Sequence, residues 1–348
     1  MDRREILAVL ARVRGVRFEN VSNLDFANFP LYSVEAWQQA SLSRTISFAV
    51  VKALREQGPD PLRTEYGRAI VIGDPDYPSS LYHLYAPPLV LYVRGCLGSA
   101  PGMAVVGTRK ATPYGRQVVE AVVPIVVAAA HTVVSGLARG IDTLAHGATL
   151  RCGGHTIAVM GRGLDAIYPR ENTLLSERIV EQGGALVSEY PEGTPPFAAH
   201  FPARNRIISG LSRACVVIEG DLGSGALITA EHTLELGREV LAVPGSIFSP
   251  QSRGPNQLIA QGATPLLDPK ALYEVLGCVP DKPMPRPTEI SLEGGLILAA
   301  LSSEALGVDD VCMHSGLSAS VTAAALVALE VEGLVARLPG GMYVRTGG

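Results

Sequence analysis

Basic side chains follow one short apolar run of the sequence, together with a glycine and two threonines. The residues concerned are Gly107, Thr108, Arg109, Lys110 and Thr112. A glycine permits a tight turn, arginine and hydroxyl groups donate hydrogen bonds, and a helix that begins after the loop presents free N–H groups. This combination is typical of a phosphate-binding loop. It is not a P-loop, because no Gly-Lys-Ser or Gly-Lys-Thr triplet occurs in the chain.

Four later loops repeat this combination of glycines, basic or amide side chains and a predicted helix start. Their candidate residues are Gly136, Arg139 and Gly140; Arg170 and Asn172; Arg204, Asn205 and Arg206; and Gly223, Ser224 and Gly225. Arginine can hold phosphate oxygens in pairs, and successive backbone N–H groups form an anion-binding nest. Asp142 is placed to cap a helix or to orient an arginine. We therefore expect several loops to bind phosphate together.

Two interpretations remain open for Arg204 and Arg206. Either they hold phosphate, while the nearby Phe197 and Phe201 stack on unpaired bases, or they pair with carboxylates and fasten their own loop. The candidate carboxylates are Asp142, Glu189 and Glu219. Phe197 and Phe201 are more typical of core residues than of a base platform.

The pattern Gly161-x-Gly163-x-x-Ala166 matches a dinucleotide-binding fingerprint only nominally. Tyr168-Pro169 follows at once, so the helix that should receive a pyrophosphate cannot begin in place. The seven histidines are dispersed, and no Ser/His/Asp order, carboxylate pair or metal-ligand spacing stands out after the apolar runs. We expect no cofactor, no metal and no enzymatic activity.

Alternating apolar runs and helical patterns from residue 103 to about 275 must position these loops. The runs cover 103–107, 132–136, 156–160, 185–189, 214–220 and 239–245, and the helical patterns include 115–130, 142–151, 172–182 and 226–236. This alternation predicts an α/β fold with a Rossmann-like parallel sheet covered on both faces. Ligands of such sheets lie beyond the carboxyl ends of the strands, where the candidate loops fall. Residues 61–100 are expected to add one or two edge strands.

Four segments are predicted along the chain. Residues 1–60 form a small helical domain of the SAM or helix-hairpin-helix type, although Arg17 stands where the hairpin motif has its second glycine. Residues 61–280 form the Rossmann-like domain, and the proline-rich segment 281–289 is a linker. Residues 290–348 follow the order of a winged helix, with helices at 291–301, 308–314 and 318–332 before a small hairpin.

Charge is distributed unevenly. The whole chain has a formal net charge of −4, yet residues 288–348 carry seven acidic residues against two arginines, a net of −5. The third helix of the predicted winged helix, 318–333, contains no lysine or arginine. Since a helix in a DNA groove must neutralise phosphate, we expect this domain to contact protein rather than DNA.

The cysteines and the apolar runs indicate a cytoplasmic protein. Five cysteines lie far apart, which fits buried thiols in a reducing compartment rather than disulfides. Uninterrupted apolar stretches are too short to span a membrane, and the first residues do not resemble a signal peptide.

Several long motifs, in order, resemble the DNA-processing protein A family, also called DprA or Smf. They are GTRKATPYG, SGLARGID, GRGLDAIYP with Asn172, SEYPEGTPPFAAHFPARNRIISGLS, GSGALIT and GREVLAVPG. The resemblance is strong over residues 65–275. It implies a bacterial cytoplasmic homodimer that binds single-stranded DNA cooperatively and loads the RecA recombinase during natural transformation. It also implies that Arg109 and Arg170 bind DNA. The composition of the loops, and not the resemblance, adds five residues to the predicted DNA site: Arg139, Asn172, Arg204, Asn205 and Arg206.

Two other functions remain open. The core also resembles the lysine-decarboxylase-like (LOG) nucleotide phosphoribohydrolases, whose Pro-Gly-Gly-x-Gly-Thr-x-x-Glu loop is loosely echoed by residues 223–231. In that case Glu231 would act on a ribose and Arg109 would hold a 5′-phosphate. The third possibility is a scaffold that binds RecA without DNA.

Overall fold

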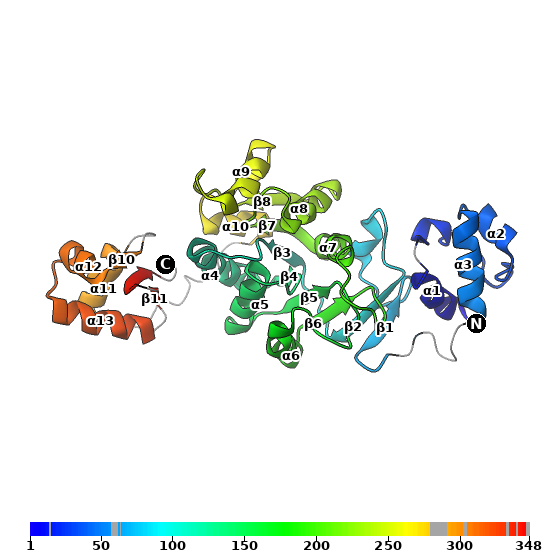
Figure 1. The fold of residues 1–348 in the computed structure, drawn as a ribbon, viewed down its shortest axis with the longest axis horizontal. Helices are drawn as coiled ribbons and strands as arrows, with labels where there is room; N and C mark the ends of the chain where they lie inside the picture. The colour runs from blue at the N-terminus through cyan, green and yellow to red at the C-terminus, as the bar shows by residue number, and fades with distance from the viewer. Residues whose placement is uncertain are drawn as a thin grey trace.

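The computed structural model describes residues 1–13, 15–56, 62, 64–278, 291–301, 305–331, 334–338 and 340–345. The predicted linker 281–289 lies outside the described residues. Three parts follow one another along the chain: an N-terminal module of short helices, a large α/β core and a small C-terminal module (Figure 1).

The N-terminal module, residues 1–56, consists of short helices around a fully buried tryptophan, Trp37. Its elements are α1 (Arg3–Ala11), η1 (Phe18–Asn20), α2 (Val34–Gln39) and α3 (Arg44–Arg55). Helix α1 begins with a capping box, in which Asp2 accepts from the Glu5 N–H and the Glu5 carboxylate accepts from the Asp2 N–H. The expected helical character of this segment is confirmed.

Among the described residues, nine strands form one mostly parallel sheet in the order β1-β2-β6-β5-β4-β3-β7-β8-β9. The strands from β3 to β9 are parallel, whereas β1 and β2 add an antiparallel edge beside β6. The expected edge strands and Rossmann-like core are confirmed. The strands are β1 (Arg68–Val71), β2 (Val90–Gly95), β3 (Gly102–Val106), β4 (Thr132–Ser135), β5 (Thr156–Met160), β6 (Ala185–Ser188), β7 (Ser212–Val217), β8 (Glu239–Ala242) and β9 (Thr264–Pro265).

Helices cover both faces of the sheet, as near-continuous apolar strands require. Helices α4, α5 and α10 pack on one face, and α7 and α8 pack on the other (Figure 1). The helices are α4 (Pro113–Ala128), α5 (Ile141–Arg151), α6 (Thr173–Glu181), α7 (His200–Gly210), α8 (Gly225–Glu235), α9 (Arg253–Ala260) and α10 (Leu272–Leu276), with short 3₁₀ turns η2 (Ser79–His83), η3 (Arg170–Asn172), η4 (Pro250–Ser252) and η5 (Pro269–Ala271).

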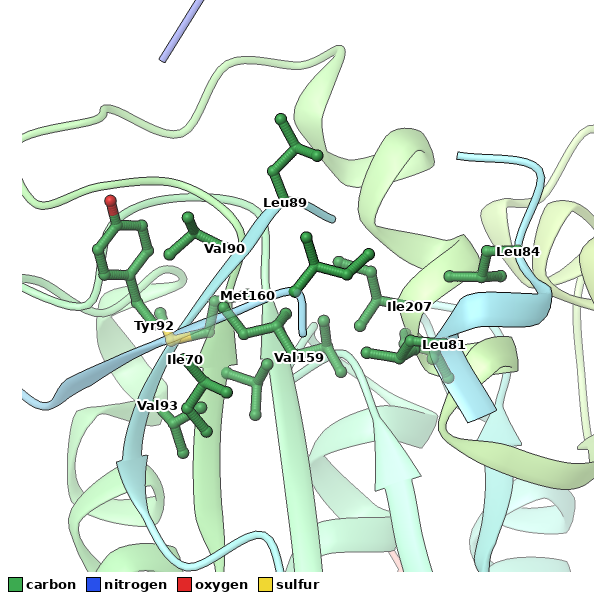
Figure 2. Packing of buried hydrophobic residues seen from close by; sticks show 14 of the residues in the cluster. Ile70, Leu81, Leu84, Leu89, Val90, Tyr92, Val93, Val159, Met160 and Ile207 are labelled. Atoms are coloured by element: carbon green, nitrogen blue, oxygen red, sulfur yellow. The ribbon is translucent and has the colours of Figure 1, made fainter. Parts of the chain in front are cut away.

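Figure 2 shows how the added edge joins the core. Ile70 of β1 and Val93 of β2 lie near Val159 and Met160 of β5, and Ile207 of α7 packs beside Leu81 of η2. Each of these side chains is at most 2% exposed. Burying a large aliphatic side chain stabilises a fold by about 1.5–3 kcal/mol, so α7 is firmly fixed against the sheet.

The C-terminal module is a winged helix, as expected. Helices α11 (Leu292–Ala300), α12 (Val308–Ser315) and α13 (Ala319–Val331) pack with a small sheet of β10 (Leu306–Gly307), β11 (Val335–Leu338) and β12 (Met342–Arg345). Among the described residues, no single helix is both long and apolar enough to cross a membrane. Helix α12 and residues Ala319–Glu330 pass that test only as a pair, across a bend of 107°.

Candidate nucleic-acid interface

The candidate loops meet at the carboxyl edge of the sheet. Strands β4, β5 and β6 follow β3 on one side, whereas β7 and β8 lie on its other side. The strand order therefore reverses between β3 and β7, and ligands of open α/β sheets bind at such a point.

A cleft of about 480 Å³ opens at this position. Its lining comes from the loops or helices that follow β3, β4, β5, β6 and β7, so the structure brings together loops that are distant in sequence. Six of the predicted site residues line it: Gly107, Arg109, Arg204, Asn205, Ser224 and Gly225.

Arg109 is the exposed basic side chain of the cleft. Its guanidinium lies over the ring of Phe201, with Cζ 5.6 Å from the ring centroid. The Tyr168 ring lies beside the Phe201 ring, with the two centroids 5.5 Å apart. Among the described residues Arg109 makes no ion pair. The arginine is thus held in place by an aromatic ring while its donors remain available to an anion.

Arg204 forms the floor of the cleft and is only 4% exposed. One of its Nη1–H groups donates to the carbonyl of Gly136 at 2.7 Å, and the same nitrogen contacts the Val159 carbonyl. A Cβ atom on Gly136 would lie 2.1 Å from the Arg204 guanidinium. Gly136 therefore leaves space for the Arg204 side chain, and it does not itself line the cleft.

The floor is a buried group of unlike charges. Asp142, 6% exposed, accepts from the Gly136 N–H at 3.1 Å and from the Ala138 N–H at 3.4 Å. Burial raises the pKa of Asp142, although the positive charge of Arg204 opposes this shift. Burial likewise lowers the pKa of Arg204 to about 10, and Asp142 opposes that change. Asp142 does not cap α5, whose N-cap is Gly140; its hydrogen bonds instead fix the β4–α5 loop.

Glu219 fixes the first loop from below. This carboxylate is 2% exposed, accepts from the Thr112 N–H at 3.0 Å and contacts the Thr112 hydroxyl. Thr112 in turn caps α4 by accepting from the Gly115 N–H at 3.2 Å. The N-terminus of α4 is therefore already supplied with a negative charge, so Thr112 positions the loop and is not free for a phosphate.

The N-terminus of α8 opens toward the cleft. Ser224 caps this helix, and both Ser224 and Gly225 line the cavity. The Asn205 amide donates to the Gly225 carbonyl at 2.9 Å and so ties α7 to this turn. Gly223 has a φ of +77°, the left-handed conformation that lets the loop turn back before the helix. Free N–H groups at a helix start favour an anion.

Polar partners within the protein also engage three further predicted site residues. Arg206 forms a bidentate pair with Glu189 at 2.6 and 2.7 Å, Arg139 pairs with the exposed Glu171, and Asn172 donates to the Leu137 carbonyl at 2.9 Å. For Arg206 this is the fastening role left open above, with Glu189 rather than Asp142 or Glu219 as the partner. None of the three lines the cleft.

Other predicted residues lie beside the cleft rather than in its lining. Lys110 and Arg170 are exposed and make no ion pair among the described residues. Thr108 is buried and accepts from the Lys110 N–H at 3.1 Å. Gly140 has a φ of +74°, and a Cβ atom there would lie 2.2 Å from the Thr108 carbonyl oxygen, so this glycine allows the first two loops to approach each other.

Sequence reasoning missed Tyr168 as a cleft residue. The available signal was an aromatic residue in a loop directly after a predicted strand. The pair Tyr168-Pro169 was interpreted only as a helix breaker. That argument itself is confirmed, because the chain forms no helix between Gly161 and Pro169 and turns into η3 only at Arg170. Glu231, required by the hydrolase alternative, lies on α8 outside the cleft lining. Within the described residues, no group of three His, Cys, Asp or Glu side chains could hold a metal ion.

Comparison with known proteins identifies the family. Residues 68–277 match the family model described as DNA recombination-mediator protein A, and residues 280–341 match the DprA winged helix domain. The chain belongs to the DprA/Smf family. The DprA/Smf core thus contains the cleft and all the loops around it.

Relatives of this family cover most of the chain. Protein Smf of Escherichia coli is 41% identical over 280 residues, covering 77% of this chain and 75% of that protein. DNA processing protein DprA of Bacillus subtilis is 43% identical over 230 residues, 65% of this chain and 74% of that protein.

Two solved DprA structures resemble this fold. The X-ray structure of DprA from Streptococcus pneumoniae has a TM-score of 0.61 and 34% identity, covering 78% of this chain and 92% of that one. A structure of DprA from Helicobacter pylori has a TM-score of 0.54 and 27% identity, covering 61% of this chain and 96% of that one, and is described as revealing a single-stranded DNA binding mode.

Proposed function

We propose that this DprA/Smf protein binds single-stranded DNA without sequence preference by laying its backbone in the cleft at the β3–β7 switch point. One observation carries the proposal: Arg109 lies over the Phe201 ring in a cleft that Arg204 and the start of α8 also line. A guanidinium and free amides suit phosphate, and aromatic rings suit unpaired bases of any sequence. The H. pylori relative, described as a single-stranded DNA binder, supports this assignment.

Exposed and buried residues have different roles in the proposed contacts with DNA. Arg109, Lys110 and Arg170 contact phosphates directly, together with the backbone amide of Gly225 at the start of α8. Arg204 contributes its charge from the floor. Three or four phosphate contacts predict a salt slope of about −2 to −3, since each contact on a single strand contributes about −0.7.

We further propose a non-catalytic role. Like other members of its family, the protein is expected to act as a homodimer in the bacterial cytoplasm and to help load RecA onto the bound strand during natural transformation. Single-strand binding by each protomer is modest, so two linked clefts would add avidity along one strand.

We assign protein contact rather than DNA contact to the winged helix. Helix α13 carries neither lysine nor arginine, and its start, Ser318–Ser320, is neutral. The exposed residues of this module include Leu292, Met313 and Val327, which are 81%, 72% and 57% exposed. Apolar side chains without positive charge favour a protein partner over a phosphate backbone.

Binding of the full chain to oligo-dT, compared with a duplex of the same length, tests this function. Fluorescence anisotropy should show tighter binding of the single strand and a loss of affinity as salt rises. Equal affinity for both, or binding that does not respond to salt, would contradict the proposal. Incubation with nucleoside monophosphates should release no free base, and release would favour the hydrolase instead.

A further inference from the structure

The contact of Arg109 with Phe201 is repeated at two other places on the molecule. Arg17 lies over the ring of Tyr85 at 5.1 Å, and Arg44 lies over the ring of Phe48 at 5.8 Å. Tyr85 is 73% exposed and Phe48 is 54% exposed. Both rings therefore present an open face or edge to solvent.

Exposure distinguishes these two pairs from the remaining contact of the same kind. In the winged helix, Arg337 lies over Tyr343 at 6.0 Å, but that ring is only 8% exposed and belongs to the core of the module. The Tyr343 ring cannot receive a base. The rings of Tyr85 and Phe48 can, because a face or edge remains open.

The two exposed pairs belong to neighbouring segments. A Cβ atom on Gly15 would lie 2.8 Å from the side chain of Ile46, so the loop that leads to Arg17 packs against α3, which carries Arg44 and Phe48. Phe18, next to Arg17, meets the Tyr82 ring with centroids 6.1 Å apart. The N-terminal module therefore adjoins the segment before β2.

Helix α7 contacts both the cleft and the segment that carries Tyr85. The Arg206 Nε–H donates to the Ala86 carbonyl at 2.9 Å, and Ala86 directly follows Tyr85. Arg206 lies on the same helix as Phe201, the ring beneath Arg109. Helix α7 therefore joins the ring beneath Arg109 to the segment that carries Tyr85.

The charges nearby favour the Arg17 pair over the Arg44 pair. Arg17 also donates to the Tyr85 hydroxyl at 2.8 Å, which fixes the pair without using a carboxylate. Arg44, in contrast, lies near enough to Glu35 to help lower the pKa of that carboxylate, behind larger effects of hydrogen bonds from its backbone and Ser33. Glu35 thus lies within electrostatic reach of Arg44.

We propose that Arg17 and Tyr85 form a second binding site for the single strand held in the cleft, with Arg44 and Phe48 extending it along α3. The occupant is unpaired polynucleotide, because an arginine on an open aromatic ring offers one donor to phosphate and one face to a base. This inference rests on the proposed function and adds a length requirement to it. Short strands fill the cleft alone, and longer strands reach the N-terminal module.

Oligonucleotide length tests the proposal. Affinities of full-length protein for oligo-dT of about 5 and about 20 nucleotides are compared for wild type, Tyr85→Ala and Arg17→Ala. Both variants should bind the longer strand at least about fivefold more weakly and the short strand unchanged. Arg17→Ala should also reduce the salt slope by about 0.7 for the longer strand only.

Matched variants separate binding from folding. Tyr85→Phe keeps the ring but removes the hydroxyl that holds Arg17, so it should weaken binding of the longer strand less than Tyr85→Ala does and leave binding of the short strand unchanged. Tyr32→Ala removes an exposed tyrosine of the N-terminal module, 51% exposed, and should change neither affinity. The urea midpoint of Tyr85→Ala should remain that of the wild type, since its ring is largely outside the core.

Two results would overturn the second site: unchanged affinity of Tyr85→Ala and Arg17→Ala for the longer strand, or equal losses for both lengths. If the proposed function itself were wrong, the measured affinities would differ in another way. Arg109→Ala should weaken both lengths, so an unchanged Arg109→Ala would contradict the proposed function rather than the second site.

Discussion

Gly136 determines where the Arg204 guanidinium can lie. It ends the fourth strand, accepts a hydrogen bond from Arg204 and leaves the space that a side chain would fill. The sequence marks this glycine as part of a phosphate loop, and its position after a strand made that interpretation reasonable. Its actual contact is with an arginine of α7, 68 residues away, which no local pattern reveals.

Gly136→Ala should destabilise the fold by about 1–3 kcal/mol, because the new methyl group would overlap Arg204. Gly147→Ala is the matched control. Gly147 lies inside α5 with its nearest neighbour 3.5 Å from an added Cβ, so alanine should stabilise the helix by about 0.5–1 kcal/mol. Urea unfolding measures both changes. A Gly136→Ala variant as stable as the wild type would contradict this close contact.

His146 makes stability depend on pH. The ring is fully buried, and its Nδ1 lies 2.8 Å from the Thr156 hydroxyl. Burial, followed by the positive charge of Arg204, lowers the pKa of His146 to about 3. Below pH 6.5 the His146 ring is therefore protonated in the unfolded chain but not in the folded chain. The free energy of unfolding falls as pH drops from 6.5 toward 3.

Replacing His146 with glutamine should remove this dependence. Between pH 7.5 and 5 the wild type should lose about 2 kcal/mol more unfolding free energy than His146→Gln, as linkage requires for a site with these two pKa values. Chemical unfolding at several pH values measures the difference. Parallel pH profiles for the two proteins would show that His146 is not the group responsible.

At the scale of elements, α7 connects the cleft to the rest of the molecule. Its first half supplies Phe201 and Arg204, and its second half packs Ile207 into the core. Arg206 joins this helix to the Ala86 carbonyl and to Glu189 after β6. Arg206 thus holds together three chain segments that surround the binding edge.

Arg206→Met should cost about 3 kcal/mol of unfolding free energy, since Glu189 would remain largely buried without its partner. The double variant Arg206→Met with Glu189→Leu should recover most of that loss. The salt slope of DNA binding should not change in either variant. A slope reduced by about 0.7 in the double variant would assign Arg206 to phosphate contact instead.

Element boundaries were largely predictable, and side-chain partners were not. The expected helix 115–130 is α4 at Pro113–Ala128, because Thr112 caps it and Pro113 begins it, both recognisable signals. The partner of Arg206 could not be chosen among three carboxylates, since that choice depends on how β6 and α7 pack. Arg109 was found from its loop alone, because a basic residue after a strand of a parallel sheet already lies at the ligand edge.

At the scale of the whole molecule, the winged helix differs in charge from the rest of the chain. Described residues of this module include Glu293, Asp309, Asp310 and Glu330. Its observed contact with the core is modest: the Gln117 side chain donates to the Arg345 carbonyl at 2.6 Å. The cleft draws none of its lining from this module.

A chain shortened to residues 1–285 should therefore keep its affinity for oligo-dT within about twofold. A single strand that needs no phosphate contact from the winged helix should also show the same salt slope. Anisotropy titrations of both chains provide the comparison. A tenfold loss on truncation, with a reduced slope, would mean that the winged helix contacts the strand.

The central claim is that Arg109, held on Phe201 at the carboxyl edge of the sheet, contacts the DNA backbone. The most direct test is the salt dependence of oligo-dT binding by Arg109→Ala, with Arg178→Ala, an exposed arginine on α6 outside the cleft lining, as control. We expect Arg109→Ala to bind oligo-dT more weakly, with a salt slope smaller by about 0.7, and we expect no change for Arg178→Ala. Identical affinity and slope for Arg109→Ala and the wild type would contradict it.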